Sequence, residues 1–554
     1  MSAADAPARS RAAVPGPARA AARDWTERLP PAWTITAAIA VAYLLVSPAS
    51  PDLAAASYRS WLFAHNGLIL WDNSWYGGHH LLAYSLLAPP LGALVGPRLV
   101  VAASMTLATA LFAALIDGLF APRAVRLAAA WFALGAGVGM LSSRVPFDLG
   151  LAIGLGALLQ ARRRRLWAAL ALSVLCALAS PVAGAFLGLA TLAWCLAGPA
   201  RAWPAALTAA ALAPIGLLAL AFPEGGAQPF VASAFYPALL GVIVVGLLVG
   251  SEQRALRIGF ALYAGALIGA YVLSTAVGGN ADRLGALAAG PIAACLLADG
   301  GERRTAGIRR TRILLVLAPF LLYWQANAPL TDFRAATSDP AVRASYYTPL
   351  LRELRALGVG YGARPVRIEV VPTVDHWEAR FVAPHAMLAR GWERQLDKLR
   401  NSLFYAAGTP DAAAYRAWLT RGAISYVALP DAPLDYSAKA EARLVRSNGL
   451  AYMHEIWSSR HWRLFAVADP QPLVEPPATL ARVGVDSLAL DVPRAGDYTV
   501  RVRFTPYWSL ARGSGCVARA PEDWTRVRAR AAGHFELVID FSFARIFSAG
   551  PRCT

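Results

Sequence analysis

The residue of this chain best suited to catalysis is Asp52, which follows the first long apolar run in the segment Ser50-Pro51-Asp52-Leu53. A carboxylate held near an apolar surface can have a raised pKa and act as a general base. The same residue could be only the N-terminal cap of a helix over 53–63. Its expected position at a membrane surface, ahead of a polar and aromatic stretch, favours the catalytic interpretation.

The 29 residues from Asp52 to His80 mix charged, aromatic and amide side chains, which contact with lipid alone would not require. Their aromatic rings could stack on a sugar or belong only to the interfacial aromatic belt of a membrane protein. The candidate substrate-binding residues of this stretch are Arg59, Asp72, Trp75, Tyr76, His79 and His80.

A second polar cluster lies at the expected outer mouth of a later span, in the sequence Gly278-Gly279-Asn280-Ala281-Asp282-Arg283. The cluster could be a turn with a capping Asp. Alternatively, the planar guanidinium of Arg283 binds the phosphate of a lipid carrier. We include Asn280, Asp282 and Arg283 among the candidate substrate-binding residues.

These clusters are embedded in a chain with the composition of a polytopic membrane protein. The 554 residues are 57% hydrophobic and 16% charged, and the mean hydropathy is +0.44. The net charge of +18 lies mostly in short Arg clusters between apolar runs, so we expect no nucleic-acid partner. The strong preference for Arg over Lys, together with the high Ala content, indicates a bacterial protein.

Apolar runs long enough to cross a bilayer predict about eleven spans within a membrane domain of residues 31–326, with an outer loop at 50–97. Residues 79–96 are also apolar, but Pro89-Pro90 favours a helix that lies on or re-enters the outer face. The predicted spans cover residues 33–49, 98–120, 124–143, 146–161, 166–180, 182–198, 204–222, 232–250, 255–277, 283–299 and 311–326.

Positive charge determines the expected orientation, because Arg and Lys collect on the cytoplasmic side. With the N-terminus inside, 19 Arg lie on its side of the membrane and four lie in the outer loops. Residues 1–30 then form a disordered cytoplasmic arm, and residues 327–554 lie outside the cytoplasmic membrane.

The outer region should contain two units. Strands that alternate with helices predict a small α/β unit over 327–475, and period-two alternation predicts a β-sandwich over 476–554. In the first unit, His376 and Trp377 lie in a loop-like segment and are further substrate-binding candidates. The segment from Arg390 to Asp397 is also rich in functional side chains, and a solvated surface helix explains it as well as a binding site does.

Five cysteines separate into two groups. Cys176, Cys195 and Cys295 lie in predicted spans and suit apolar packing. Cys516 and Cys553 lie in the outer β-unit, where an oxidising compartment would allow a disulfide, and two free thiols are the alternative. No Cys/His spacing typical of a zinc site occurs.

The N-terminal half resembles the GT-C superfamily of membrane glycosyltransferases over roughly residues 33–330. The features that carry the resemblance are an acidic residue directly after the first span (Asp52), the Trp-Tyr-Gly-Gly-His segment at 75–79, the Pro-containing segment from Tyr84 to Pro90, and a span that starts with Pro97-Arg98. The resemblance is strongest to the bacterial branch often labelled a 6-pyruvoyl-tetrahydropterin-synthase-related membrane protein. Many GT-C members have paired acidic residues in the first loop, whereas Leu53 follows Asp52 here, so we expect no cofactor, with a divalent metal ion as the weaker alternative.

The resemblance implies an enzyme that transfers a sugar from a polyprenyl-phosphate donor to an acceptor of the cell envelope, with inversion at the anomeric carbon. Asp52 would be the base, and Arg283 would bind the donor phosphate together with His79 or His80. A transporter or an envelope-assembly factor that binds lipid-linked glycan is the non-enzymatic alternative. Transport would need inverted repeats and polar residues near the bilayer midplane, and the sequence has neither. A degenerate glycosyltransferase that only binds glycan is a third possibility.

Overall fold

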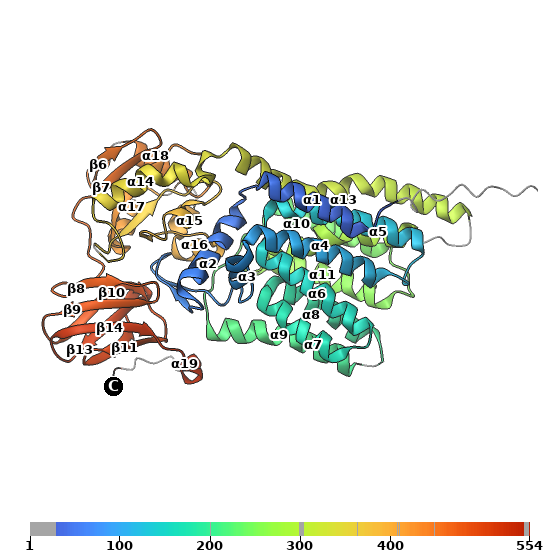
Figure 1. Cartoon of the computed structure of the whole chain (residues 1–554), viewed down its shortest axis with the longest axis horizontal. Helices are drawn as coiled ribbons and strands as arrows, with labels where there is room; N and C mark the ends of the chain where they lie inside the picture. The colour runs from blue at the N-terminus through green and yellow to red at the C-terminus, as the bar shows by residue number, and fades with distance from the viewer. Residues whose placement is uncertain are drawn as a thin grey trace, which may run out of the picture.

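The computed structural model describes residues 29–199, 201–298, 304–362, 364–406, 408, 410–447, 449–547 and 553, with only the backbone described for 304–310. Residues 1–28 of the predicted N-terminal arm lie outside this part. The molecule is elongated, with a helical bundle at one end and two strand-rich units at the other (Figure 1).

Every predicted span coincides with a helix of the bundle, and two further helices occupy the predicted outer loop. The helices are α1 (Ala32–Val46), α2 (Pro51–Asn66), α3 (Ala88–Val95), α4 (Pro97–Ile116), α5 (Pro122–Gly139), α6 (Val145–Arg162), α7 (Leu166–Ala179), α8 (Pro181–Ala197), α9 (Ala202–Ala221), α10 (Ala232–Leu247), α11 (Arg254–Val272), α12 (Asp282–Ala298) and α13 (Arg304–Ser338).

Seven of the described helices are long and apolar enough to cross a membrane, or eight if the bent pair of α1 and α2 is one span. The chain is therefore a multi-pass membrane protein. The helices α7, α8 and α10 are shorter than this length, so the total of eleven crossings stays a prediction.

The bundle is built around α4, α5, α6 and α12, in which at least half of the apolar window is buried, against 11% in α11. Small residues allow close packing there: a Cβ atom added at Gly150 of α6 would lie 2.7 Å from the Cβ of Ala183. Proline in the first turn starts six of the described helices from α1 to α13, namely α2, α3, α4, α5, α6 and α8, because its missing N–H is not needed there.

The predicted outer loop is partly helical, since α2 occupies residues 51–66. Beyond it, the short strands β1 (Trp71–Asp72) and β2 (His79–His80) form a hairpin whose turn has positive φ angles at Tyr76, Gly77 and Gly78. This hairpin reaches the strand-rich units, because the Asn73 amide donates to the Val485 carbonyl at 2.8 Å.

The first strand-rich unit has a mixed five-stranded sheet with the order β4-β3-β5-β7-β6. Strand β3 runs parallel to both of its neighbours, whereas β7 runs antiparallel to β5 and β6. The elements are α14 (Ala344–Ala356), β3 (Arg367–Val370), α15 (Glu378–Phe381), β4 (Met387–Leu388), α16 (Arg394–Arg400), α17 (Ala412–Arg421), β5 (Ile424–Pro430), α18 (Lys439–Arg446), β6 (Met453–Ser458) and β7 (Trp462–Val467).

The second unit is a sandwich of two antiparallel sheets, with the orders β11-β14-β9-β8 and β10-β13-β12, that share one apolar core. A disulfide joins Cys516 to Cys553, as predicted. The elements are β8 (Thr479–Val483), β9 (Ser487–Val492), β10 (Gly496–Arg503), β11 (Trp508–Arg512), β12 (Gly515–Arg519), β13 (Trp524–Ala529), β14 (Gly533–Ile539) and α19 (Phe543–Phe547).

Candidate active site

A cavity of about 400 Å³, here called the interface cavity, lies between the bundle and the first strand-rich unit. Its wall comes from the start of α2, the start of α6, the start of α12 and the C-terminal half of α13. The strand-rich unit adds Val374, Trp392 and Arg394. Segments that are far apart in the sequence therefore meet at one place.

Asp52 lines the interface cavity together with two arginines from other helices. Its Oδ2 atom lies 3.7 Å from Nε of Arg144 and 3.8 Å from a terminal nitrogen of Arg283. The three side chains are 34%, 25% and 20% exposed. Both distances are longer than a hydrogen bond, so the carboxylate and the guanidinium groups face the same space without being locked together.

Asp52 is not the N-cap of α2, so the capping alternative is wrong. Ser50 is the N-cap, Pro51 is the first helical residue, and Asp52 lies in the first turn. A carboxylate at this position is stabilised by the unpaired amide groups and the dipole of the helix start.

Three other carboxylates line the interface cavity, and each is more constrained than Asp52. Asp282 accepts a hydrogen bond from the Trp324 indole at 2.7 Å. Asp332 accepts one from the Ser142 hydroxyl at 2.6 Å. Asp148 is only 3% exposed. Asp52 accepts no hydrogen bond from any described residue, so its oxygens are the most accessible to a substrate.

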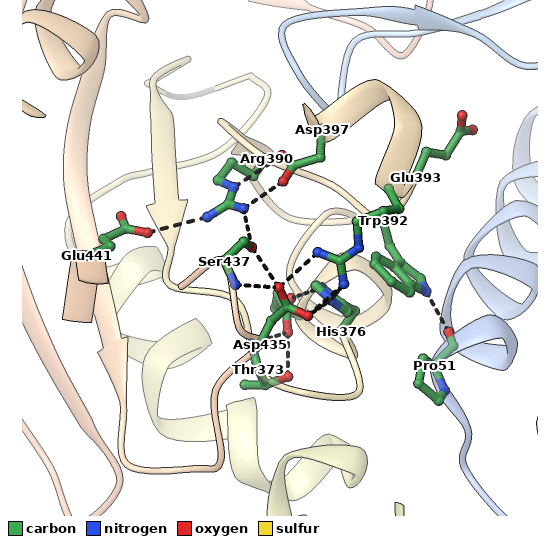
Figure 2. Close-up of polar contacts among 12 residues, drawn as sticks. Pro51, Thr373, His376, Arg390, Trp392, Glu393, Asp397, Asp435, Ser437 and Glu441 are labelled. Atoms are coloured by element: carbon green, nitrogen blue, oxygen red, sulfur yellow. Dashed lines mark hydrogen bonds and ion pairs between the residues drawn. The ribbon is translucent and has the colours of Figure 1, made fainter. Parts of the chain in front are cut away.

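The strand-rich unit contacts the start of α2 through Trp392. The Trp392 indole donates to the Pro51 carbonyl at 2.8 Å, and its ring stacks on His376 with centroids 3.6 Å apart (Figure 2). Arg394 forms a bidentate pair with Asp435, at 2.8 and 2.6 Å. These contacts hold two lining side chains, Trp392 and Arg394, at the cavity.

The segment from Arg390 to Asp397 is not a solvated surface helix, so that alternative is wrong. Arg390, Glu393 and Asp397 are 3%, 7% and 4% exposed. Arg390 donates to both oxygens of Asp397, at 3.1 and 2.6 Å, to the Ser437 hydroxyl at 2.8 Å and to Glu441 at 3.4 Å (Figure 2). The segment is a buried network of charges.

His376 lies beside this network between two carboxylates. Its Nδ1 atom is 3.2 Å from Glu378 Oε1, and its Nε2 atom is 3.3 Å from Asp435 Oδ2. Burial by itself would lower the pKa of His376, but the hydrogen bonds to Asp435 and Glu378 outweigh burial and raise the pKa above its ordinary value of 6.5. The predicted neighbour Trp377 does not line the cavity and donates to the Ala49 carbonyl at 3.0 Å.

Most predicted residues of the first outer loop also lie away from the interface cavity. Arg59 is 4% exposed, pairs with Glu393, and stacks on Tyr84 with its Cζ atom 4.0 Å from the ring centroid. Trp75 is fully buried between Tyr58 and His79. These side chains hold the loop against α2 and the strand-rich unit.

The remaining predicted site residues of that loop are buried as well. Asp72 accepts hydrogen bonds from Tyr58 at 3.0 Å and from the Ser74 amide at 2.8 Å, and burial raises its pKa to about 6. Burial lowers the pKa of His79 well below its ordinary range. His80 pairs with Glu224 at 2.9 Å and contacts the Thr505 hydroxyl at 3.0 Å. Tyr76 is also buried and lines another cavity.

Of the predicted site residues, the fold brings Asp52, Asn280, Asp282 and Arg283 together in the interface cavity. Arg144 and Asp148 also line this cavity, and nothing local in the sequence indicated that Arg144 approaches Asp52. Asp332, Trp392 and Arg394 were not among the predicted site residues. One local feature of the sequence pointed to Trp392 and Arg394 as site residues, namely the density of functional side chains over 390–397.

The residues around Asp52 do not suit a divalent cation. Two guanidinium groups lie within 4 Å of its carboxylate and would repel such an ion. Within the described residues, no group of three His, Cys, Asp or Glu side chains is placed to hold a metal. No step below uses a metal.

Comparison with known proteins identifies the fold. No family model and no curated protein sequence matches the chain. The apo crystal structure of the Archaeoglobus fulgidus oligosaccharyltransferase aligns over 96% of both chains, with a TM-score of 0.51 and 11% identity. Arabinofuranosyltransferase AftD from Mycobacteria aligns over 87% of this chain, with a TM-score of 0.45 and 18% identity, and this chain spans 42% of its length. The oligosaccharyltransferase and AftD are both GT-C superfamily membrane glycosyltransferases.

Proposed function

We propose that this chain, which has the GT-C membrane fold, is a glycosyltransferase that moves a sugar from a polyprenyl-phosphate donor to an acceptor of the bacterial cell envelope. The observation that carries the proposal is the approach of two guanidinium groups to one accessible carboxylate, Asp52, in the interface cavity. A base beside a phosphate-binding pair is what the transfer of a sugar from a lipid phosphate requires.

In the proposed reaction, Asp52 accepts the proton of the acceptor hydroxyl while that oxygen forms a bond to the anomeric carbon. The bond from this carbon to the phosphate oxygen breaks, and its electron pair leaves on polyprenyl phosphate. Arg283 and Arg144 stabilise the charge on the departing phosphate. The acceptor oxygen and the phosphate are on opposite sides of the anomeric carbon, so the configuration inverts.

This sequence of events requires Asp52 to separate from the guanidinium groups so that the sugar can enter between them. The distances of 3.7 and 3.8 Å, together with the partial exposure of all three side chains, favour such a separation. The buried loop residues Arg59, Asp72, Trp75, His79, His80 and Trp377 then act indirectly, by holding the loop and α2, rather than by contact with the sugar.

The test is sugar transfer by purified protein with a panel of polyprenyl-phosphate sugars as donors and a cell-envelope glycan fraction as the acceptor, followed as release of polyprenyl phosphate. The Asp52→Asn variant retains the size of the side chain, and we expect kcat to fall by about 10²–10⁴ because general-base assistance is lost. The Arg283→Ala variant should mainly raise KM, since a phosphate contact is removed.

Matched controls are Asp117→Asn and Arg257→Ala, which change exposed residues outside the interface cavity and should leave turnover at the wild-type level. Near wild-type turnover of Asp52→Asn would remove Asp52 from the mechanism and direct attention to Asp148. If no donor of the panel is turned over by the wild-type protein, the proposed reaction class is refuted.

A further inference from the structure

A second cavity, of about 250 Å³, lies where the first outer loop meets both strand-rich units, and we call it the arginine cavity. Its wall includes Tyr76 from the loop and Trp524 from the sandwich. It also includes four arginines from different elements: Arg367, Arg400, Arg421 and Arg503. Like charges are rarely gathered in a small cavity unless an anion compensates them.

Two of these arginines have no carboxylate within ion-pair distance among the described residues. Arg367 is 2% exposed and donates only to the carbonyls of Gly422 and Arg501, at 2.5 and 2.6 Å. Arg503 donates to the carbonyls of Glu522 and Tyr76, at 2.6 and 3.3 Å. Backbone carbonyls orient a guanidinium but do not neutralise its charge.

The other two arginines have acidic neighbours. Arg400 pairs with Asp523 at 2.8 Å, and Arg421 lies 3.8 Å from Glu522. The Nε atoms of Arg367 and Arg400 are buried without a hydrogen-bond partner. Four guanidinium groups against two carboxylates leave the wall with an excess positive charge.

The pKa values of the arginines agree with this imbalance. Burial, followed by repulsion from Arg400 and Arg367, lowers the pKa of Arg503 to about 9. Burial, followed by repulsion from Arg501, lowers the pKa of Arg367 to about 10. Both groups remain cationic at neutral pH, so an anion in the cavity would relieve an unfavourable interaction.

The size and the aromatic residues of the wall indicate more than a simple ion. Since one water occupies about 30 Å³ in the liquid, a cavity of about 250 Å³ has room for roughly eight waters, which is far more than one phosphate or carboxylate group fills. The Arg503 guanidinium lies over the Trp524 ring, with its Cζ atom 3.9 Å from the ring centroid. Tyr76 and Trp418 supply further aromatic surface.

We propose that the arginine cavity binds an anionic sugar unit, in which a carboxylate or phosphate substituent meets the guanidinium groups and the sugar ring fills the remaining volume. This binding site is separate from the interface cavity and does not depend on the proposed transfer reaction.

One residue connects the two cavities. The Tyr76 hydroxyl accepts a hydrogen bond from the Glu393 amide at 2.8 Å and donates to the Glu393 carbonyl at 3.3 Å. Glu393 lies between Trp392 and Arg394, which line the interface cavity. A glycan with an anionic unit in the arginine cavity would therefore be held close to the segment that contacts α2.

The experiment is isothermal titration calorimetry on the full-length protein in detergent with four probes: glucuronate, glucose 6-phosphate, inorganic phosphate and glucose. We expect one of the two anionic sugars to bind more tightly than both inorganic phosphate and glucose. In Arg503→Gln the affinity should fall at least about tenfold, since a charge-assisted contact is lost in a partly buried site. Arg421→Gln should weaken binding less, because Arg421 is 50% exposed.

Two controls separate this proposal from the proposed function. Arg482→Gln removes an exposed ion pair with Glu536 elsewhere on the sandwich and should leave binding unchanged. Asp52→Asn should also bind the anionic sugar normally, whatever its effect on transfer. Absence of binding by both anionic sugars, or equal binding by Arg503→Gln and Arg421→Gln, would overturn the site. Inorganic phosphate that binds as tightly as the better of the two anionic sugars would overturn the assignment to a sugar.

Discussion

The titratable side chain of His376 contacts Trp392, which lines the interface cavity. The imidazole lies between Glu378 and Asp435, and its ring is stacked on Trp392. Its positive charge is therefore stabilised in the folded protein, and the folded state binds a proton more tightly than the unfolded chain does.

This raised pKa predicts how stability depends on pH. The contribution of His376 to stability is complete below its unfolded pKa and is lost as the pH rises through the higher folded pKa. Between about pH 6 and about pH 9, the Tm of the wild-type protein should fall relative to that of His376→Gln. Thermal unfolding of both proteins in detergent measures this difference, and the exposed His454→Gln serves as the control. A constant difference in Tm across the range would show that His376 does not titrate there.

At the scale of elements, the candidate active site depends on one short segment that contacts both α2 and the first outer loop. Trp392 donates to the Pro51 carbonyl, and Glu393 contacts Tyr76 and Arg59. Gly391 directly precedes Trp392 and packs on Trp75. A Cβ atom at position 391 would lie 2.5 Å from Cγ of the fully buried Trp75 ring.

Gly391→Ala should therefore displace this segment. We expect a destabilisation of about 1–3 kcal/mol, which is typical of overpacking in a rigid core, and reduced donor turnover because Trp392 and Arg394 move with the segment. Gly362→Ala is the matched control, since a Cβ atom there meets no atom within 4 Å. Thermal unfolding and the donor assay should both distinguish the two variants, and equal behaviour would show that the segment tolerates the added methyl group.

At the scale of the whole molecule, both cavities lie at the same end of the helical bundle. The interface cavity lies where the bundle meets the strand-rich units, and the arginine cavity lies between those units. Figure 1 shows both units at the same end of the bundle. If that end is extracytoplasmic, donor and acceptor meet outside the cytoplasm.

Reporter fusions test this orientation. Alkaline phosphatase fused at the C-terminus should be active, and a fusion within the Arg162–Arg165 segment should be inactive, because Arg clusters remain in the cytoplasm. Green fluorescent protein at the same two positions should give the opposite pattern. An active alkaline phosphatase in the Arg162–Arg165 segment would invert the predicted topology and place Asp52 on the cytoplasmic side.

Much of the architecture could be predicted from the sequence, because apolar runs and Arg clusters are local signals that lipid and water impose on any chain. The helix positions follow from these signals, the sandwich follows from period-two alternation, and the Cys516–Cys553 pair follows from an oxidising outer compartment. Asp52 and Arg283, chosen as candidate site residues, line one cavity. The partners of those residues were decided only by the tertiary structure. Arg144 meets Asp52 because α6 begins beside the start of α2, and Trp392 contacts Pro51 from 341 positions away.

The sequence likewise did not indicate which polar and aromatic side chains are buried. The aromatic and polar residues at 71–80 have a composition suited to binding a sugar, yet the fold uses nearly all of them as packing between the bundle and the strand-rich units. The four arginines of the second cavity come from four separate segments, so no local spacing predicts their meeting. Composition indicates which segments can lie in the membrane and which polar segments must lie outside it. Long-range packing determines which of the polar side chains face a cavity.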